Sequence, residues 1–125
     1  MAYVTSEATF AQASVGGPGF GQLVASACLQ SILVIVTTLT TVSGGPTVGL
    51  DLLLGDNQNA NLNPNTDTSW ASNAVATGIT VPLSAGGSAS AVVLVNGCAR
   101  GVRPNVGWGT PGGSFKIQIG ARDAN

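Results

Sequence analysis

Histidine is absent from this chain of 125 residues, and ionisable side chains of every other kind are scarce. Four basic and five acidic residues make up 7% of the chain, against about 25% in an average protein. Histidine carries most proton transfer near neutral pH, and nucleophiles and metals usually need carboxylates or thiolates gathered in one place. Because the few acids are scattered along the chain, we expect no enzyme, no cofactor and no metal site.

The shortage of basic residues also bears on the partner. Lys116, Arg100, Arg103 and Arg122 are outnumbered by the acids and form no basic face, whereas binding to phosphates needs several such residues. We therefore expect no nucleic-acid partner. Disorder is excluded as well, because 44% of the residues are hydrophobic and few are charged. Residues 1–125 are expected to form one folded domain.

Only two cysteines occur, Cys28 and Cys98, each in an apolar stretch and seventy positions apart. We expect two buried free thiols, which behave as small hydrophobic side chains. A disulfide is the alternative if the chain folds in an oxidising compartment. The first residues lack the basic start and apolar core of a signal peptide, so secretion by that route is not expected.

Long uncharged runs replace the missing charges, above all over residues 23–42. A hydropathy window would mark this segment as a membrane helix, which is one alternative. Its Ile, Val and Thr residues are β-branched and fit a pleated sheet better than a helix, and it lacks aromatic or basic anchors at its ends. We predict two strands, over residues 22–30 and 32–42.

Further strands are predicted over 47–54, 79–83, 91–95 and 114–120. The last has the clearest pattern, because Phe115, Ile117 and Ile119 alternate with polar residues. Residues 84–88 contain Gly-Gly and predict a hairpin between the second and third of these strands. Pro82 gives up a backbone donor, so its strand is predicted to lie at an edge or to bulge there.

Two segments are predicted to be loops, the asparagine-rich residues 55–69 and the glycine- and proline-rich residues 98–113. The stretch Asp56–Trp70 suggests an alternative function as a calcium- or glycan-binding module, since amide and carboxylate oxygens bind calcium and a tryptophan can stack on a sugar. Its two aspartates are fewer than calcium loops normally gather, and we expect no small-molecule ligand.

The predicted fold is all-β, a single antiparallel β-sandwich or jelly-roll-like barrel with long Gly/Asn-rich loops. Residues 1–19 are predicted to form an N-terminal arm, or a short strand followed by the breaker at 16–19. The edges of a sheet are usually protected from further pairing by charged side chains, and this chain has very few charged residues. Another copy or another protein is therefore expected to cover the edges.

These expectations favour a structural subunit of a large assembly, a small phage virion protein such as a capsid cement, decoration or spike-base protein. Its partners would be further copies of itself and a major capsid or other scaffold protein, and its location the virion, assembled in the host cytoplasm. Aromatic and arginine side chains are the usual interface anchors. The candidates here are Phe10, Phe20, Trp70, Arg100, Arg103 and Trp108. For Trp108 the alternative is a ring placed in the domain's own core.

Overall fold

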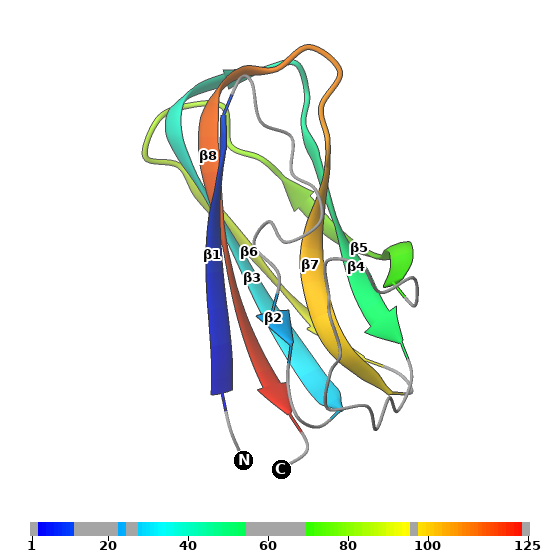
Figure 1. Ribbon diagram of the computed structural model, residues 1–125. Helices are drawn as coiled ribbons and strands as arrows, with labels where there is room; N and C mark the ends of the chain where they lie inside the picture. The colour runs from blue at the N-terminus through cyan, green and yellow to red at the C-terminus, as the bar shows by residue number, and fades with distance from the viewer. Residues whose placement is uncertain (1–2, 12–22, 25–27, 55–69, 96–97, 124–125) are drawn as a thin grey trace.

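The computed structural model describes residues 3–11, 23–24, 28–54, 70–95 and 98–123 (Figure 1). These residues form eight strands and no helix. The strands are β1 (Tyr3–Ala11), β2 (Leu23–Val24), β3 (Leu29–Ser43), β4 (Thr47–Leu54), β5 (Trp70–Thr80), β6 (Ser88–Leu94), β7 (Ala99–Gly107) and β8 (Gly112–Asp123). The prediction of an all-β chain is confirmed. For residues 1–19 the expectation was an arm or a short strand, and β1 is a strand within that segment.

The strands form two four-stranded antiparallel sheets that pack face to face, as the two layers in Figure 1 show. Sheet A has the order β1-β8-β3-β6, and sheet B has the order β2-β7-β4-β5. The first strand therefore pairs with the last, the second with the seventh, the third with the sixth and the fourth with the fifth. A long hairpin rolled into two layers has this nesting, which is the jelly-roll arrangement.

The longest uncharged segment forms one strand, β3, where two strands had been predicted. Residues 29–43 are extended because Ile32, Val34 and Val36 all point into the core, and a strand places every second side chain on the same face. The alternative of a membrane helix is wrong for this part of the segment. Across the described residues, no helix has the length and apolar character needed to cross a membrane.

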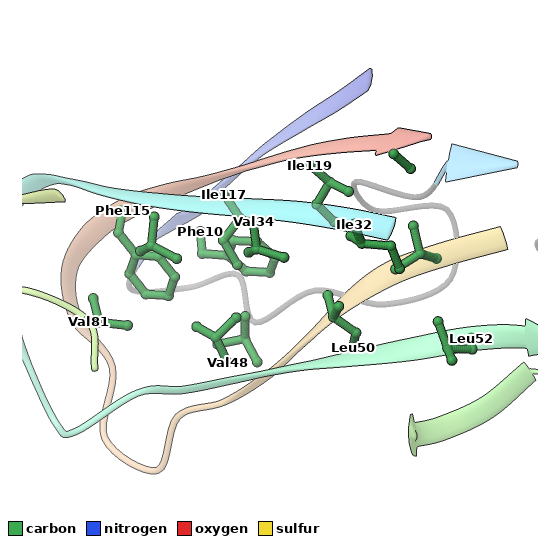
Figure 2. Packing of buried hydrophobic residues seen from close by; sticks show 14 of the residues in the cluster. Phe10, Ile32, Val34, Val48, Leu50, Leu52, Val81, Phe115, Ile117 and Ile119 are labelled. Carbon is green, nitrogen blue, oxygen red and sulfur yellow. The ribbon is translucent and has the colours of Figure 1, made fainter. Parts of the chain in front are cut away.

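The core lies between the two sheets and consists mainly of apolar side chains (Figure 2). Sheet A contributes Phe10 from β1, five residues of β3 and the alternating Phe115, Ile117 and Ile119 of β8. Val48, Leu50 and Leu52 of β4 face them from sheet B. The predicted strand over residues 114–120 is confirmed as part of β8, and its period-two pattern is the reason that its large side chains lie together.

The hairpin predicted between residues 79–83 and 91–95 is wrong. β5 ends at Thr80 and pairs with β4 in sheet B, whereas β6 pairs with β3 in sheet A, so the connection crosses between the layers. Pro82 has no N–H for a ladder and lies in this connection. The connection is bound to Thr38 of β3, whose hydroxyl donates to the Pro82 carbonyl and whose backbone N–H donates to the Gly87 carbonyl over 2.9 Å.

Most of the predicted loop over residues 98–113 is strand β7, which is a second correction. Val102, Pro104 and Val106 are buried and alternate with more exposed residues, so this stretch has the period of a strand despite its glycines and proline. β2 pairs only with Gly101 and Val102. In the described chain β7 therefore has a partner on one side only at Pro104, and such an edge position needs no N–H from proline.

Two links join β3 of sheet A to β7 of sheet B, one at each end. Cys28 and Cys98 form a disulfide immediately before the two strands begin, so the expectation of free thiols is wrong. The sequence places these cysteines far apart, but the jelly roll brings the starts of β3 and β7 to the same end. At the other end, the indole Nε1 of Trp108 donates to the Ser43 carbonyl over 2.8 Å.

Gly44 allows the turn after β3 to approach the Trp108 end of the sandwich closely. Its φ is +91°, a conformation that favours glycine, and a Cβ there would collide with the Thr110 carbonyl of the β7–β8 connection. Trp108 also contacts the Phe115 ring, with centroids 5.1 Å apart, and Phe115 stacks on Phe10 at 5.6 Å. This aromatic row closes the core at the end opposite the disulfide.

Removing the disulfide should destabilise the domain strongly. The bond closes a loop of 70 residues, so replacing both Cys28 and Cys98 by serine should lower the free energy of unfolding by about 4 kcal/mol. Urea denaturation followed by tryptophan fluorescence measures this, with the reduced wild-type protein as the matched control. Equal midpoints for the oxidised and reduced proteins would contradict the prediction.

Trp108 should contribute to stability through both its ring and its indole N–H. Trp108→Ala should lower the free energy of unfolding by about 3–5 kcal/mol, because it removes a large buried side chain. Trp108→Phe keeps an aromatic ring and loses the bond to Ser43, which should cost about 1–2 kcal/mol. Thermal and urea unfolding of both variants checks this order. An alanine variant as stable as the wild type would contradict a contribution of the Trp108 ring to stability.

Candidate interaction surface

Two of the six predicted interface residues lie inside the domain. Phe10 is fully buried between the sheets, and Trp108 is buried against Phe115, so the alternative of a core position for Trp108 is confirmed. Phe20 lies outside the described residues. Trp70 is the first residue of β5. Among the aromatic candidates whose side chains the structure describes, none is exposed.

The two remaining candidates, Arg100 and Arg103, lie on β7. The side chain of Arg103 is 17% exposed, and its Nε donates to Oδ2 of Asp51 over 2.9 Å. Asn105 donates to the other carboxylate oxygen of Asp51, also over 2.9 Å. Asp51 is thus held by two residues of the neighbouring strand. That Arg100 and Arg103 contact a partner stays a prediction.

Local strand irregularities surround this polar cluster of Asp51, Arg103 and Asn105. β7 has one more residue than β4 between the pairs Leu53–Gly101 and Leu54–Ala99, so Arg100 lies in a bulge. β5 has two more residues than β4 between the pairs Leu50–Val75 and Leu52–Ala71, which flank Asp51. Bulges of this kind re-aim side chains. The cluster ties β4 to β7 on the face of sheet B that points away from the core.

Chemistry at this cluster is limited by what surrounds the carboxylate. Asp51 has both oxygens occupied by donors from β7, and histidine is absent from the chain. No group of three or more acidic or cysteine side chains that could hold a metal ion occurs among the described residues. The Asp56–Trp70 stretch lies outside them apart from Trp70, so the calcium and glycan expectations stay predictions.

Three of the four large apolar side chains that are exposed on the described strands gather on the outer face of sheet A, and the fourth is Leu39, further along β3. Leu33 of β3 is 41% exposed, and Val92 and Leu94 of β6 are 66% and 76% exposed. Ile35 of β3 lies on the same face and is partly exposed. We call these four residues the β3–β6 patch. Contiguous apolar surface of this kind marks contact sites with other molecules.

The register of sheet A makes these residues neighbours. Leu33 lies opposite Val92 on one side and opposite Gly120 of β8 on the other. A Cβ added at Gly120 would meet nothing within 4 Å, so the outer face of the sheet is open beside Leu33. The charged residues of this face lie further towards β1, on β1 and β8, and there Gln118 donates to Glu7 over 3.0 Å. The patch therefore occupies the β6 side of the sheet.

Sequence reasoning missed this patch because the pattern is ambiguous. Residues 32–36 are all apolar, and Val92, Val93 and Leu94 follow one another on β6. In a strand with one face on the core, half of such a run must point outward, but the sequence alone does not say which half. An unbroken apolar run in a one-sided sheet was the available signal. It predicts an exposed apolar strip without naming its residues.

Comparison with protein-family models, with curated proteins and with solved structures found no match for this chain. Its fold and its surface are therefore the basis for assigning a function.

The link between Asp51 and Arg103 should be strongly coupled. Asp51→Leu leaves the guanidinium of Arg103 without its carboxylate in a partly buried place and should lower the free energy of unfolding by about 2–4 kcal/mol. Adding Arg103→Met should recover much of that loss, because an apolar pair of similar size needs no charge partner. Urea denaturation of both single variants and the double variant measures the coupling; strictly additive losses would contradict it.

Proposed function

We propose that this chain is a non-enzymatic structural subunit of a large protein assembly, a small phage virion protein of the cement, decoration or spike-base kind. The observation that carries the proposal is the β3–β6 patch, with Val92 and Leu94 mostly exposed on a chain that has only nine charged residues. Solvent is a poor environment for such a surface, and few charges oppose association. Further copies and a major capsid or other scaffold protein would cover it.

The fold and the disulfide support a virion location. Jelly rolls recur in viral capsid and lectin domains, although a fold alone does not define a function. Virion surfaces are among the oxidising environments where disulfides persist, and the Cys28–Cys98 bond needs such an environment. A small domain fixed at both ends of β3 and β7 is also suited to bearing load between neighbours.

The contact that one β3–β6 patch can make is weak, and it needs other contacts to hold a subunit in place. Full burial of one leucine or valine side chain contributes about 1.5–3 kcal/mol, while association of two free molecules costs about 4–15 kcal/mol. The four side chains of the β3–β6 patch are already partly covered, so one patch supports a weak contact by itself. Within an assembly, several contacts per subunit are made at once, and their effects multiply through high effective concentration. A cement role fits this energetics.

The first test is the mass of the purified protein in detergent-free buffer. Size exclusion coupled to light scattering, run over a concentration series, should find a closed oligomer, because the apolar patch needs cover. A monomer at every concentration would contradict assembly through this chain's own surface. Titrating that monomer with calcium and with simple sugars, followed by tryptophan fluorescence, would then test the alternative binding module.

A further inference from the structure

We propose that β6 pairs in antiparallel fashion with β6 of a second copy, so that two A sheets join into one continuous sheet across a twofold axis. The inference rests on the proposed function and names the element through which the chain meets its own copy. Three features support it: how each sheet edge is protected, the direction of the backbone N–H and C=O groups of β6, and the residues of the two copies that would lie opposite each other.

The four edge strands differ in how well they resist the addition of another strand. β2 is two residues long, and β5 is interrupted by register shifts and by Gly78 at a φ of +70°. β1 presents the charged Glu7 on its exposed face. Short length, bulges and charge are the usual protections of an edge. β6 has none of them, because its seven residues are uncharged and pair with β3 without a register shift.

The backbone of β6 has unused hydrogen-bonding groups on one side. Val95 donates to the Gln30 carbonyl, and the Gly87 carbonyl accepts from Thr38, so within β6 the odd-numbered residues direct their N–H and C=O groups to β3. Groups alternate along an antiparallel strand, and even-numbered residues therefore direct theirs away from β3. In the described part of the chain, no strand lies beyond β6. These groups are the template for an added strand, and the residues that present them are Ser88, Ser90, Val92 and Leu94.

A twofold axis at Ala91 uses the whole strand. Even-numbered residues must then oppose even-numbered ones, and centring on Ala91 pairs all residues from Ser88 to Leu94. Leu94 falls opposite Ser88 of the second copy, and Val92 falls opposite Ser90. Each large side chain thus meets a small one, and the half-buried Ala91 faces its own counterpart. A shift of the axis to Ser90 or Val92 would leave two residues of each strand unpaired.

Charge also favours a second copy as the occupant. β6 carries no charge, and neither does the stretch of β3 beside it. The basic residues of this face, Lys116 and Arg122, lie on β8, two strands away and roughly 10 Å from β6. Two copies therefore bring no like charges together at the join. A charged partner strand would find no opposite charge on β6 to pair with.

A cysteine placed on the axis tests the register directly. Ala91→Cys would oppose its own copy at a non-hydrogen-bonded pair, where Cα atoms are about 4.5 Å apart and a disulfide can form. Ala89→Cys is the matched control, because it lies on the same face but about 14 Å from its counterpart along the paired strands. Under mild oxidation, intact mass should show covalent dimers for the first variant and not for the second. Equal cross-linking of the two variants, or none in either, would overturn the proposed pairing.

A second pair of variants separates edge pairing from contact through the sheet face. Val92→Pro removes an edge-directed N–H that β3 does not use, so the domain should keep its melting temperature within a few degrees while the mass of the oligomer falls at least twofold. Val92→Thr keeps the N–H and the branched shape and should keep the oligomer. An oligomer that survives Val92→Pro overturns the β6 pairing and leaves the assembly proposal standing. A wild-type protein that is monomeric at every concentration overturns both.

Discussion

The alternation of side chains along β3 is the constraint on which the rest of the structure depends. A strand packed on one face places every second residue in the core, and β3 buries Ile32, Val34 and Val36. The same rule forces Leu33 and Ile35 outward, although they are equally apolar. The sequence of this strand therefore satisfies the core and leaves an apolar strip on the outside. Cover for that strip has to come from beyond the sheet, which is the physical reason for proposing an assembly subunit.

Two links fix the layers that this alternation creates. β3 and β7 start beside the Cys28–Cys98 disulfide and end beside the bond from Trp108 to Ser43. They run in the same direction in opposite sheets, so both ends of the sandwich are held across the core. On the far side of sheet B, Asp51 joins β4 to β7 through Arg103 and Asn105. β7 thus takes part in all three links, and its glycines and proline are compatible with them because one of its sides is largely unpaired within the described chain.

How much the sequence predicts varies with the element. β8 follows from the alternation of Phe115, Ile117 and Ile119, because large apolar residues at every second position leave little choice. β7 was predicted as a loop because Gly101, Pro104 and Gly107 are typical of turns, and only its tertiary partner β4 makes it a strand. The disulfide depends on the jelly-roll nesting, which brings residues 28 and 98 together. Arg103 was predicted to lie in that loop and to contact a partner, and its bond to Asp51 depends on a strand register that spacing along the chain does not contain.

Joining two A sheets at β6 would have a further consequence for assembly. Across the join, a row of outward positions would read Leu33, Val92, then Ser90 and Ile35 of the second copy. The twofold axis would be perpendicular to the extended sheet. The apolar residues of both copies would therefore lie on the same side of it, because residues directly opposite each other in an antiparallel pair point to the same face. Edge pairing therefore gives hydrogen-bond partners to the backbone groups at the free side of β6. It leaves the β3–β6 patches exposed and brings the two patches together into a larger apolar surface. A pair of chains would still need cover on that face, so a dimer is the first step of an assembly whose second contact is made through side chains.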